Sequence, residues 1–359
     1  MAATNWKAAS MRSLTKAAIV APPLLFIISN VTLCTLLPFV HMDTIIRLTY
    51  NANTLYLPLL LGLAAAVLFV APRSRTRLAT TWLTAALLLL SLRIYATHIE
   101  PYRLQVREAT IYTNNVRQPL RVLHMSDIQS PGLGSYEARV FARVRALKPD
   151  MILYTGDFLQ PLGEATIASE LSELAAHFRS LKVPLGIFAV EGESDHAIRH
   201  LTPEALGGVR FLHTEAVTLQ HQDTVIHILG LQLADTRTRG ALPMEQVERW
   251  LSEAPDGALR IVLGHRPDYM MRLDDHAIDL CVAGHTHGGQ VRVPFFGPIM
   301  TSSGVPRDWA RGFRVDGRAH FNVSAGIGSG HNKGLPAIRF NCPPEMTLLH
   351  LLPEKEGTR

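Results

Sequence analysis

The sequence predicts an α/β domain that follows three apolar helices. The first observation is compositional. Apolar stretches dominate the chain before about residue 95, and from about residue 101 the chain has the mixed apolar and polar composition of an ordinary α/β domain. The second is a repeated pattern, in which a short apolar run stops at Gly or Ser and a metal-capable side chain follows. Because α/β folds place functional polar residues in loops at strand ends, this pattern predicts a site at one edge of a sheet.

Composition limits the classes of protein that the chain can belong to. Hydrophobic residues make up 47% of the 359 residues and charged residues 18%, and the mean hydropathy of +0.13 is high for a wholly soluble protein. The formal charge is +5, but Lys and Arg form no block, so no nucleic-acid partner is indicated. The three cysteines, Cys34, Cys281 and Cys342, cannot form a disulfide framework and are expected to be small buried thiols.

Three apolar stretches predict membrane helices at about residues 17–40, 55–71 and 78–94, and none carries a charge before Arg93. A helix needs roughly 20 apolar residues to cross a bilayer, and the second and third stretches are near the short limit. Prolines interrupt the first stretch, which a membrane helix tolerates better than a soluble one. A buried helical bundle is the alternative, but it would need polar faces that these stretches lack. The expectation is an integral membrane protein with membrane lipids as partners.

The distribution of Lys and Arg predicts the orientation in the membrane. Basic residues precede the first stretch and fill the second loop, whereas the first loop has only Arg47, beside Asp43. This bias places the region after the third stretch outside the cytoplasm, although Arg93, Arg103 and Arg107 weaken it. An extracytoplasmic domain is therefore expected.

Helix and strand patterns alternate in the second part of the chain. Strands are expected at residues 121–125, 151–154, 185–190, 260–263 and 278–283, and helices at 136–147 and 165–180. The expected organisation is a tail at 1–16, a transmembrane region at 17–95, a linker at 96–117, a domain at 118–352 and a tail at 353–359.

The most specific motif is G-H-T-H-G-G-Q at residues 284–290, directly after an apolar run. His285 and His287 leave the expected strand in a tight loop, and the flanking glycines let the backbone approach a ligand closely. Because neutral imidazole is the commonest protein metal ligand, the motif indicates a metal site, with a solvated turn as the alternative. The other strand ends supply further candidates: Asp127, Gln129, Asp157, Glu193, Asp195, His196 and His265.

Together these motifs resemble those of the calcineurin-like metallophosphoesterases, in the branch often fused to N-terminal membrane segments. That family carries D-x-H, G-D, G-N-H-D, G-H and G-H-x-H, and this chain shows D-I-Q, G-D, G-E-S-D, G-H and G-H-T-H in the same order. The ending R-F-N-C-P-P-E at residues 339–345 is also similar, and the match runs from about 118 to 352. The resemblance implies a two-sheet αββα sandwich and a metal-dependent phosphoric ester hydrolase.

The resemblance also implies a dinuclear metal site. Asp127 and His287 would bind the first ion, His265 and His285 the second, and Asp157 would bridge them. Mixed imidazole and carboxylate ligands suit Mn, Fe or Zn, of which we favour Mn, rather than Ca or Mg. Two ions roughly 3.5–4 Å apart can share a hydroxide nucleophile and hold the phosphate oxygens for in-line attack.

The chain departs from the family pattern in two motifs. Gln129 stands where the family usually has histidine, and its neutral amide predicts a weaker first metal site. In the other motif, Glu193 takes the asparagine position and would still bind the second metal. Ser194 replaces the histidine that assists the leaving group, and serine cannot supply a proton near neutral pH. His196 either replaces that acid or faces solvent, and Asp195 would orient a neighbouring residue.

A glycine-rich loop at residues 326–334 holds two candidates for substrate binding. Lys333 or His331 would replace a phosphate contact that arginine makes at position 325 in the similar branch, unless the loop is an ordinary flexible one. Nearby, Phe295 and Phe296 are expected to pack into a wall of the domain rather than to form a substrate platform.

The expected function is metal-dependent hydrolysis of a phosphoester or phosphoanhydride at a membrane surface, where a lipid-linked substrate is reasonable. Losing a general acid typically costs about 10²–10⁴-fold in rate, which would restrict the enzyme to good leaving groups. One alternative is a membrane protein whose degenerate site serves binding or scaffolding. Another is a UDP-2,3-diacylglucosamine-type pyrophosphatase, which would need a site facing the cytosol.

Overall fold

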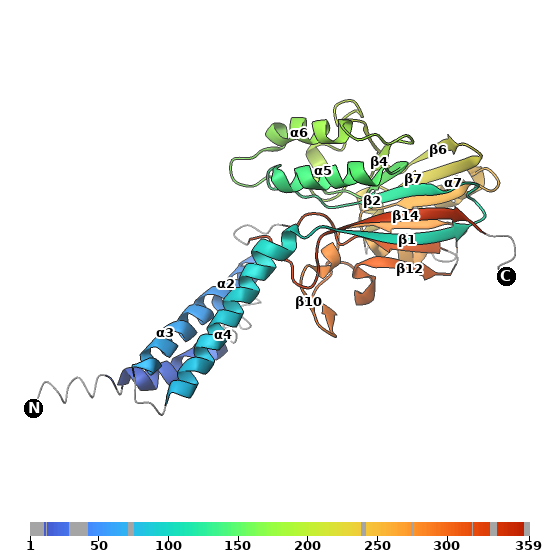
Figure 1. The fold of residues 1–359 in the computed structure, drawn as a ribbon. Helices are drawn as coiled ribbons and strands as arrows, with labels where there is room; N and C mark the ends of the chain where they lie inside the picture. The colour runs from blue at the N-terminus through green and yellow to red at the C-terminus, as the bar shows by residue number, and fades with distance from the viewer. Residues whose placement is uncertain are drawn as a thin grey trace, which may run out of the picture. The chain divides into compact units, whose positions relative to one another are not determined.

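The computed structural model describes residues 11, 13–28, 42–70, 75–237, 242–273, 276–317, 319–330 and 336–354. The chain divides after Ile99 into two compact units, a helical N-terminal unit and a larger α/β unit (Figure 1). The candidates His331 and Lys333, and also Cys34, lie outside the described residues.

The N-terminal unit is built from apolar helices. It contains α2 (Met42–Asn51), which continues through a π-helical turn into α3 (Leu57–Phe69), and α4 (Thr76–Ile94). Two continuous helical segments, Arg47–Phe69 and Thr76–Tyr102, have the length and apolar composition that a bilayer span requires. A shorter apolar helix, Ser13–Ile28, covers the start of the first expected span, and most of the remainder of that span is outside the described residues.

Small residues let the helices of this unit approach closely. Ala64 and Leu68 of α3 are buried against Ala79 of α4. Small side chains at helix contacts are typical of helices that associate in a membrane, where van der Waals packing provides most of the attraction.

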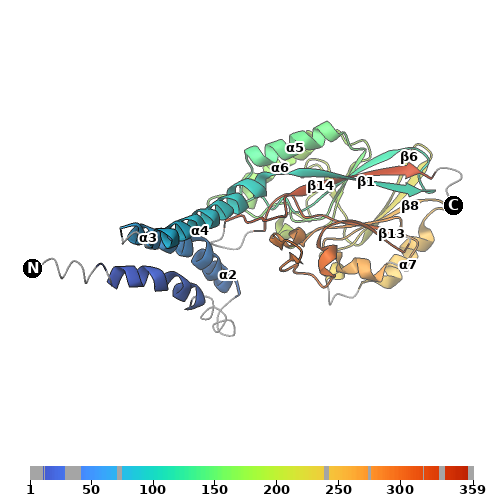
Figure 2. The same cartoon turned by 60° about the horizontal axis from the view of Figure 1, so that its bottom comes forward.

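The second unit consists of two six-stranded sheets with helices on their outer faces (Figures 1 and 2). The first sheet has, in order, β1 (Gln105–Thr113), β14 (Glu345–Pro353), β2 (Leu120–Met125), β3 (Met151–Tyr154), β4 (Ile187–Ala189) and β5 (Val209–Phe211). The second has β12 (Gly312–Asp316), β13 (Ala319–Val323), β9 (Leu280–Ala283), β8 (Leu259–Leu263), β7 (Thr224–Gly230) and β6 (Glu215–His221). The helices are α5 (Ser135–Leu147), α6 (Ile167–Arg179) and α7 (Met244–Glu253). This is the expected αββα sandwich.

Side chains along the buried strands point alternately toward the helices and toward the other sheet, and this alternation separates the layers of the sandwich. In β2, Leu123 and Met125 pack with the core under α5 and α6, whereas Leu120 and Val122 face the second sheet. Successive side chains of a strand point to opposite faces, so a strand covered on both sides is a continuous apolar run. The runs that predicted β2, β3, β8 and β9 are of this kind, and for this reason they were visible in the sequence.

The first strand of the domain lies inside the expected linker. Strand β1 pairs in parallel with β14, with Gln105 opposite Glu345 at one end and Thr113 opposite Pro353 at the other. The segment 96–117 is therefore not only a linker, because the backbone of residues 105–113 pairs with β14 in the first sheet. Only half of its side chains are covered, which weakened its apolar signal.

His124 links the two sheets. Its Nε2 forms a hydrogen bond of 2.9 Å with Thr155 Oγ1, and its Nδ1 is 2.6 Å from Asn322 Nδ2 on β13. Burial lowers the pKa of this imidazole to about 3, so it stays neutral at physiological pH.

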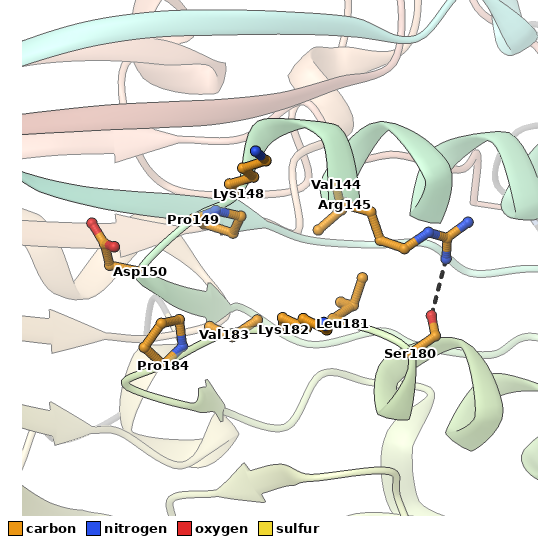
Figure 3. Close-up of a pocket in the computed structure, with 10 residues that line it drawn as sticks. All are labelled: Val144, Arg145, Lys148, Pro149, Asp150, Ser180, Leu181, Lys182, Val183 and Pro184. Atoms are coloured by element: carbon orange, nitrogen blue, oxygen red, sulfur yellow. Dashed lines mark hydrogen bonds between the residues drawn. The ribbon is translucent and has the colours of Figure 1, made fainter.

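The described residues also form a hollow of about 420 Å³ between the carboxyl ends of α5 and α6 (Figure 3). Arg145 donates to Ser180 Oγ at 2.9 Å across it. Asp150 and Pro184 line the hollow just before β3 and β4 begin. It is therefore at the amino ends of the parallel strands, whereas the predicted site residues follow their carboxyl ends.

Candidate metal centre

Five strand-end loops bring the predicted metal ligands together at one edge of the sandwich. Two sheets contribute: the first through the loops after β2, β3 and β4, the second through the loops after β8 and β9. The residues that these loops supply are Asp127, Gln129, Asp157, Glu193, His265, His285 and His287. Their assembly requires the two sheets to end at the same edge, which the parallel strands provide.

The backbone turns sharply at most of these residues. Asp127, Gln129, Asp157, His285 and His287 all have positive φ, between 37° and 67°. L-residues rarely adopt this conformation, and where it persists it clusters at active sites and ligand-binding loops. These turns end the extended course of the strands at the residues that supply the candidate ligands.

One group of possible ligands comprises Asp127, Asp157 and His265, whose ligand atoms lie within 4.8 Å of one another. His265 Nε2 is 3.6 Å from Asp157 Oδ2. His287 extends this group, with Nε2 3.6 Å from Asp127 Oδ1. All four side chains are buried, so a cation held here would be screened from solvent.

The other group comprises Glu193, His265 and His285, again within 4.8 Å. Glu193 Oε2 lies 2.6 Å from His265 Nε2 and 3.1 Å from His285 Nδ1. Its other oxygen accepts a hydrogen bond from Arg266 Nε at 2.7 Å and also contacts Arg266 Nη2. Sequence reasoning missed Arg266, because nothing local to G-H-R indicates a partner in the loop after β4.

Two of the three residues that depart from the family pattern, Gln129 and Ser194, contact Asp157. Gln129 Nε2 donates to Asp157 Oδ2 at 2.6 Å, and its buried Oε1 has no hydrogen-bond partner among the described residues. Ser194 donates twice to Asp157 Oδ1, from its backbone nitrogen at 2.8 Å and its hydroxyl at 2.9 Å. An unpaired buried amide oxygen beside carboxylates and imidazoles fits a site built for a cation.

Asp195 organises the backbone of the centre. Its buried carboxylate accepts hydrogen bonds from the backbone nitrogens of Asp157, Phe158 and Gly192, at 2.7, 2.9 and 2.8 Å. This geometry suits the orienting role that was expected. His196 is exposed, and the hydrogen bonds and ion pairs of the described centre include none of its atoms.

The centre concentrates negative charge away from water. Burial, reinforced by Asp157, raises the pKa of Asp127 to about 7, and it raises the pKa of Asp195 to about 7 in the same way. Burial would lower the pKa of His265, but Asp157 and Glu193 outweigh it and raise that pKa to about 10. A divalent cation would neutralise these carboxylates, so the charge distribution also fits metal binding.

Arg339, the first residue of the R-F-N-C-P-P-E motif, has a role that the sequence did not reveal. It is fully buried, and it donates hydrogen bonds to the carbonyl oxygens of Ala325 at 2.7 Å, Gly328 at 3.0 Å and Cys342 at 3.1 Å. The loop that it holds lies on the centre, because Gly328 N donates to Asp127 O at 2.7 Å. Arg339 therefore holds one wall of the site in place.

We predict that Arg339→Met destabilises the protein by about 3 kcal/mol and weakens metal binding. Several buried carbonyl groups would lose their donor, and each unsatisfied buried group costs about 1–3 kcal/mol. Thermal unfolding of the full chain in detergent, with and without added Mn, measures both effects. Arg145→Met is the matched control, because the exposed Arg145 side chain makes only a surface hydrogen bond and should change stability by less than about 0.5 kcal/mol. Equal unfolding temperatures for the two variants would contradict the role of Arg339.

The fold and the site define an α/β-sandwich hydrolase that binds divalent metals. The family model of the calcineurin-like phosphoesterases matches residues 120–289. The chain belongs to this family and is a metal-dependent phosphoric ester hydrolase.

Curated relatives agree with this assignment. The phosphodiesterase YaeI of Escherichia coli is 30% identical over 214 residues, which cover 57% of this chain and 71% of that protein. The uncharacterized metallophosphoesterase YkuE of Bacillus subtilis is 27% identical, with coverage of 72% and 88%. The UDP-2,3-diacylglucosamine pyrophosphatase LpxG of Chlamydia muridarum is 26% identical, with coverage of 73% and 93%.

The sulfate thiohydrolase SoxB of Thermus thermophilus aligns with a TM-score of 0.37 and 13% identity, covering 61% of this chain and 54% of that one.

Proposed function

We propose that this protein is a membrane-anchored phosphoesterase that hydrolyses a phosphoester or phosphoanhydride with two divalent ions, Mn, Fe or Zn, of which Mn is favoured. The observation that carries the proposal is the position of Asp157. Its Oδ2 lies 2.6 Å from Gln129 Nε2 and 3.6 Å from His265 Nε2, so this oxygen is close to a candidate ligand of each ion. A carboxylate in that place can be shared by two cations.

Each half of the cluster would hold one ion. Asp127, His287 and Gln129 would bind the first, and His265, His285 and Glu193 the second, with Asp157 common to both. When bound, the ions would polarise the phosphate oxygens and acidify the attacking water.

The chain's own residues would orient these ligands. Asp195 holds the backbone of Asp157, and Ser194 fixes one of its oxygens. Hydrogen-bonded supporting residues of this kind typically affect metal affinity by about 10–100-fold.

Membrane anchoring is supported by the two apolar segments, Arg47–Phe69 and Thr76–Tyr102. The Lys and Arg bias supports an extracytoplasmic catalytic domain.

A lipid-linked substrate is supported by relatives that are UDP-2,3-diacylglucosamine pyrophosphatases. Those relatives favour the same pyrophosphatase activity as a second candidate function, which requires a cytosolic domain. Reporter fusions at the C-terminus, active on only one side of the membrane, distinguish the two orientations.

Metal analysis and hydrolysis assays on the purified full chain test the proposed function. We expect about two equivalents of metal per chain, loss of activity toward an aryl phosphodiester on chelation, and recovery with added Mn. Tight metal binding without hydrolysis of any phospho-substrate would instead support a binding or scaffolding role. Binding of a single ion would contradict the dinuclear site.

We predict that Arg266→Lys and Arg266→Gln both weaken the second metal by about tenfold. Arg266 contacts Glu193 Oε1 through two nitrogens and so fixes the carboxylate that faces His265 and His285. Lysine keeps the charge but not the forked geometry, and glutamine lacks the charge. Calorimetric titration with Mn measures the affinities. Tighter binding by Arg266→Gln would show that the positive charge repels the metal more than the geometry assists it.

A further inference from the structure

A small apolar hairpin projects from the domain next to the metal centre. Strands β10 (Arg292–Val293) and β11 (Gly297–Pro298) pair only with each other among the described strands, and Figure 1 shows β10 lying apart from the two sheets. We call residues 292–300 the apolar hairpin. It exposes five large apolar side chains: Val293, Phe295, Phe296, Ile299 and Met300. The expectation that Phe295 and Phe296 pack into a wall is wrong, because their exposed fractions are 112% and 58%.

The hairpin is held in this exposed arrangement by the domain. Arg292 N donates to Phe340 O at 2.9 Å, and Phe340 N donates to Gln290 O at 2.9 Å, so the base is tied to the C-terminal segment. At the tip, Phe295 has a φ of 66°, which is a genuine outlier for a bulky residue. Such a conformation costs of the order of 1–3 kcal/mol and persists where the surrounding structure imposes it.

The chain connects the hairpin to the candidate site at both ends. It begins three residues after Gly289 of the G-H-T-H-G-G-Q motif. Just beyond it, the carbonyl oxygen of Ser302 lies 3.1 Å from His285 Nε2. The base of the hairpin therefore lies beside the loop that carries His285.

The charged side chain within the hairpin and the one that stacks on it are both basic, although Asp308 directly follows Arg307. No Asp or Glu occurs from Gln290 to Pro306. Arg292 lies within the hairpin, and the guanidinium of Arg307 is 4.6 Å from the centre of the Phe296 ring. An apolar tip with arginines at its rim matches the boundary between acyl chains and anionic headgroups. A second copy of this chain would present the same arginines, so the charges favour lipid over self-association.

We propose that the apolar hairpin inserts into the surface of an anionic phospholipid bilayer. The proposal rests on the proposed function in one respect: the membrane anchor keeps a bilayer within reach of the domain. Insertion would place the metal centre at headgroup depth, where the phosphate groups of lipid-linked substrates lie. The inserted residues would position the enzyme on its substrate layer without contacting the reacting atoms.

Site-directed labelling of the full chain in nanodiscs tests the insertion. Cys34→Ser is the background, because Cys281 and Cys342 are buried. An environment-sensitive fluorophore is attached at Phe295→Cys and, separately, at Met300→Cys, so that the test survives if one variant folds poorly. Tyr112→Cys on β1 is the control matched to Met300, with exposed fractions of 55% and 58%. The nanodiscs contain phosphatidylcholine alone or mixed with phosphatidylglycerol.

Insertion predicts a blue-shifted label at positions 295 and 300 that acyl-chain nitroxide lipids quench and aqueous iodide does not. The blue shift and the nitroxide quenching should be larger with phosphatidylglycerol. The label at position 112 should be quenched by iodide and not by the nitroxide lipids. Iodide quenching at 295 and 300 equal to that at 112 would overturn the proposal. Protection from iodide without nitroxide quenching would also overturn it, because it would indicate burial against protein. Metal content and incorporation into nanodiscs are measured on the same samples, so a failed metal site or anchor is recognised separately.

Discussion

Replacing Asp157 with asparagine is expected to lower kcat by at least about 10³-fold. Asp157 is the carboxylate that we propose both metals share, and loss of several kcal/mol of transition-state stabilisation corresponds to a rate loss of this size. Asparagine tolerates the left-handed backbone that Asp157 adopts at φ 60°, so the turn should survive. Its amide oxygen can still accept the hydrogen bonds that Ser194 donates.

Unfolding measurements separate a lost metal site from a damaged fold. Besides burial, Asp157 raises the pKa of Asp127 and Asp195, and it also raises the pKa of His265. Removing its charge relieves the repulsion but loses the attraction, so the unfolding temperature of chelated protein should change little. Added Mn should then stabilise the wild type but not the variant, because a ligand stabilises the state that it binds. Asp150→Asn is the matched control, since Asp150 immediately precedes β3 and accepts a hydrogen bond only at the opposite end of that strand. Full Mn stabilisation of Asp157→Asn would refute the shared-ligand role.

Ser194→His is expected to increase kcat toward an alkyl phosphodiester by about 10²-fold while leaving an aryl phosphodiester nearly unchanged. The wild-type side chain lies beside Asp157, 2.9 Å from its carboxylate, and cannot protonate a leaving group near neutral pH. A histidine there supplies that proton, which an alkoxide needs and a phenolate does not. Activity toward the alkyl substrate should fall as the pH rises through the pKa of the new imidazole, ordinarily about 6.5.

Two further variants make this result interpretable. Ser194→Ala removes the hydrogen bond to Asp157 without adding an acid, so both substrates should lose activity to the same extent. His196→Ala tests whether the exposed His196 already acts as the acid, and unchanged turnover would eliminate it. If Ser194→His behaves as Ser194→Ala does on both substrates, protonation of the leaving group does not limit the reaction.

Much of the fold was accessible from the sequence, because the signals were local. The strands of the sandwich interior are covered on both faces, so they appear as short apolar runs, and β3 coincides with the expected range 151–154. Strand β1 was taken for a linker because it lies at the sheet edge and buries few of its side chains. Edge strands carry a weak pattern for this reason.

The ligand candidates were also accessible, because each follows the end of a strand within its own motif. Their supporting residues were not. Arg266 and Glu193 are 73 residues apart, and Ser194 and Asp157 are 37 apart. No local pattern links such pairs, because their contact exists only after the strands have been ordered in the two sheets.

The sequence by itself determined the apolar N-terminal helices, the buried strands and the polar residues that end them, since these follow from hydrophobic periodicity and residue chemistry. Tertiary structure alone decided that His265 belongs to both groups of possible ligands, that Arg339 is buried under the loop at the site, and that Phe295 faces solvent. Periodicity reports whether a side chain can be buried. Which atoms it meets depends on the order and direction of strands far apart in the chain, and that order is a property of the whole fold.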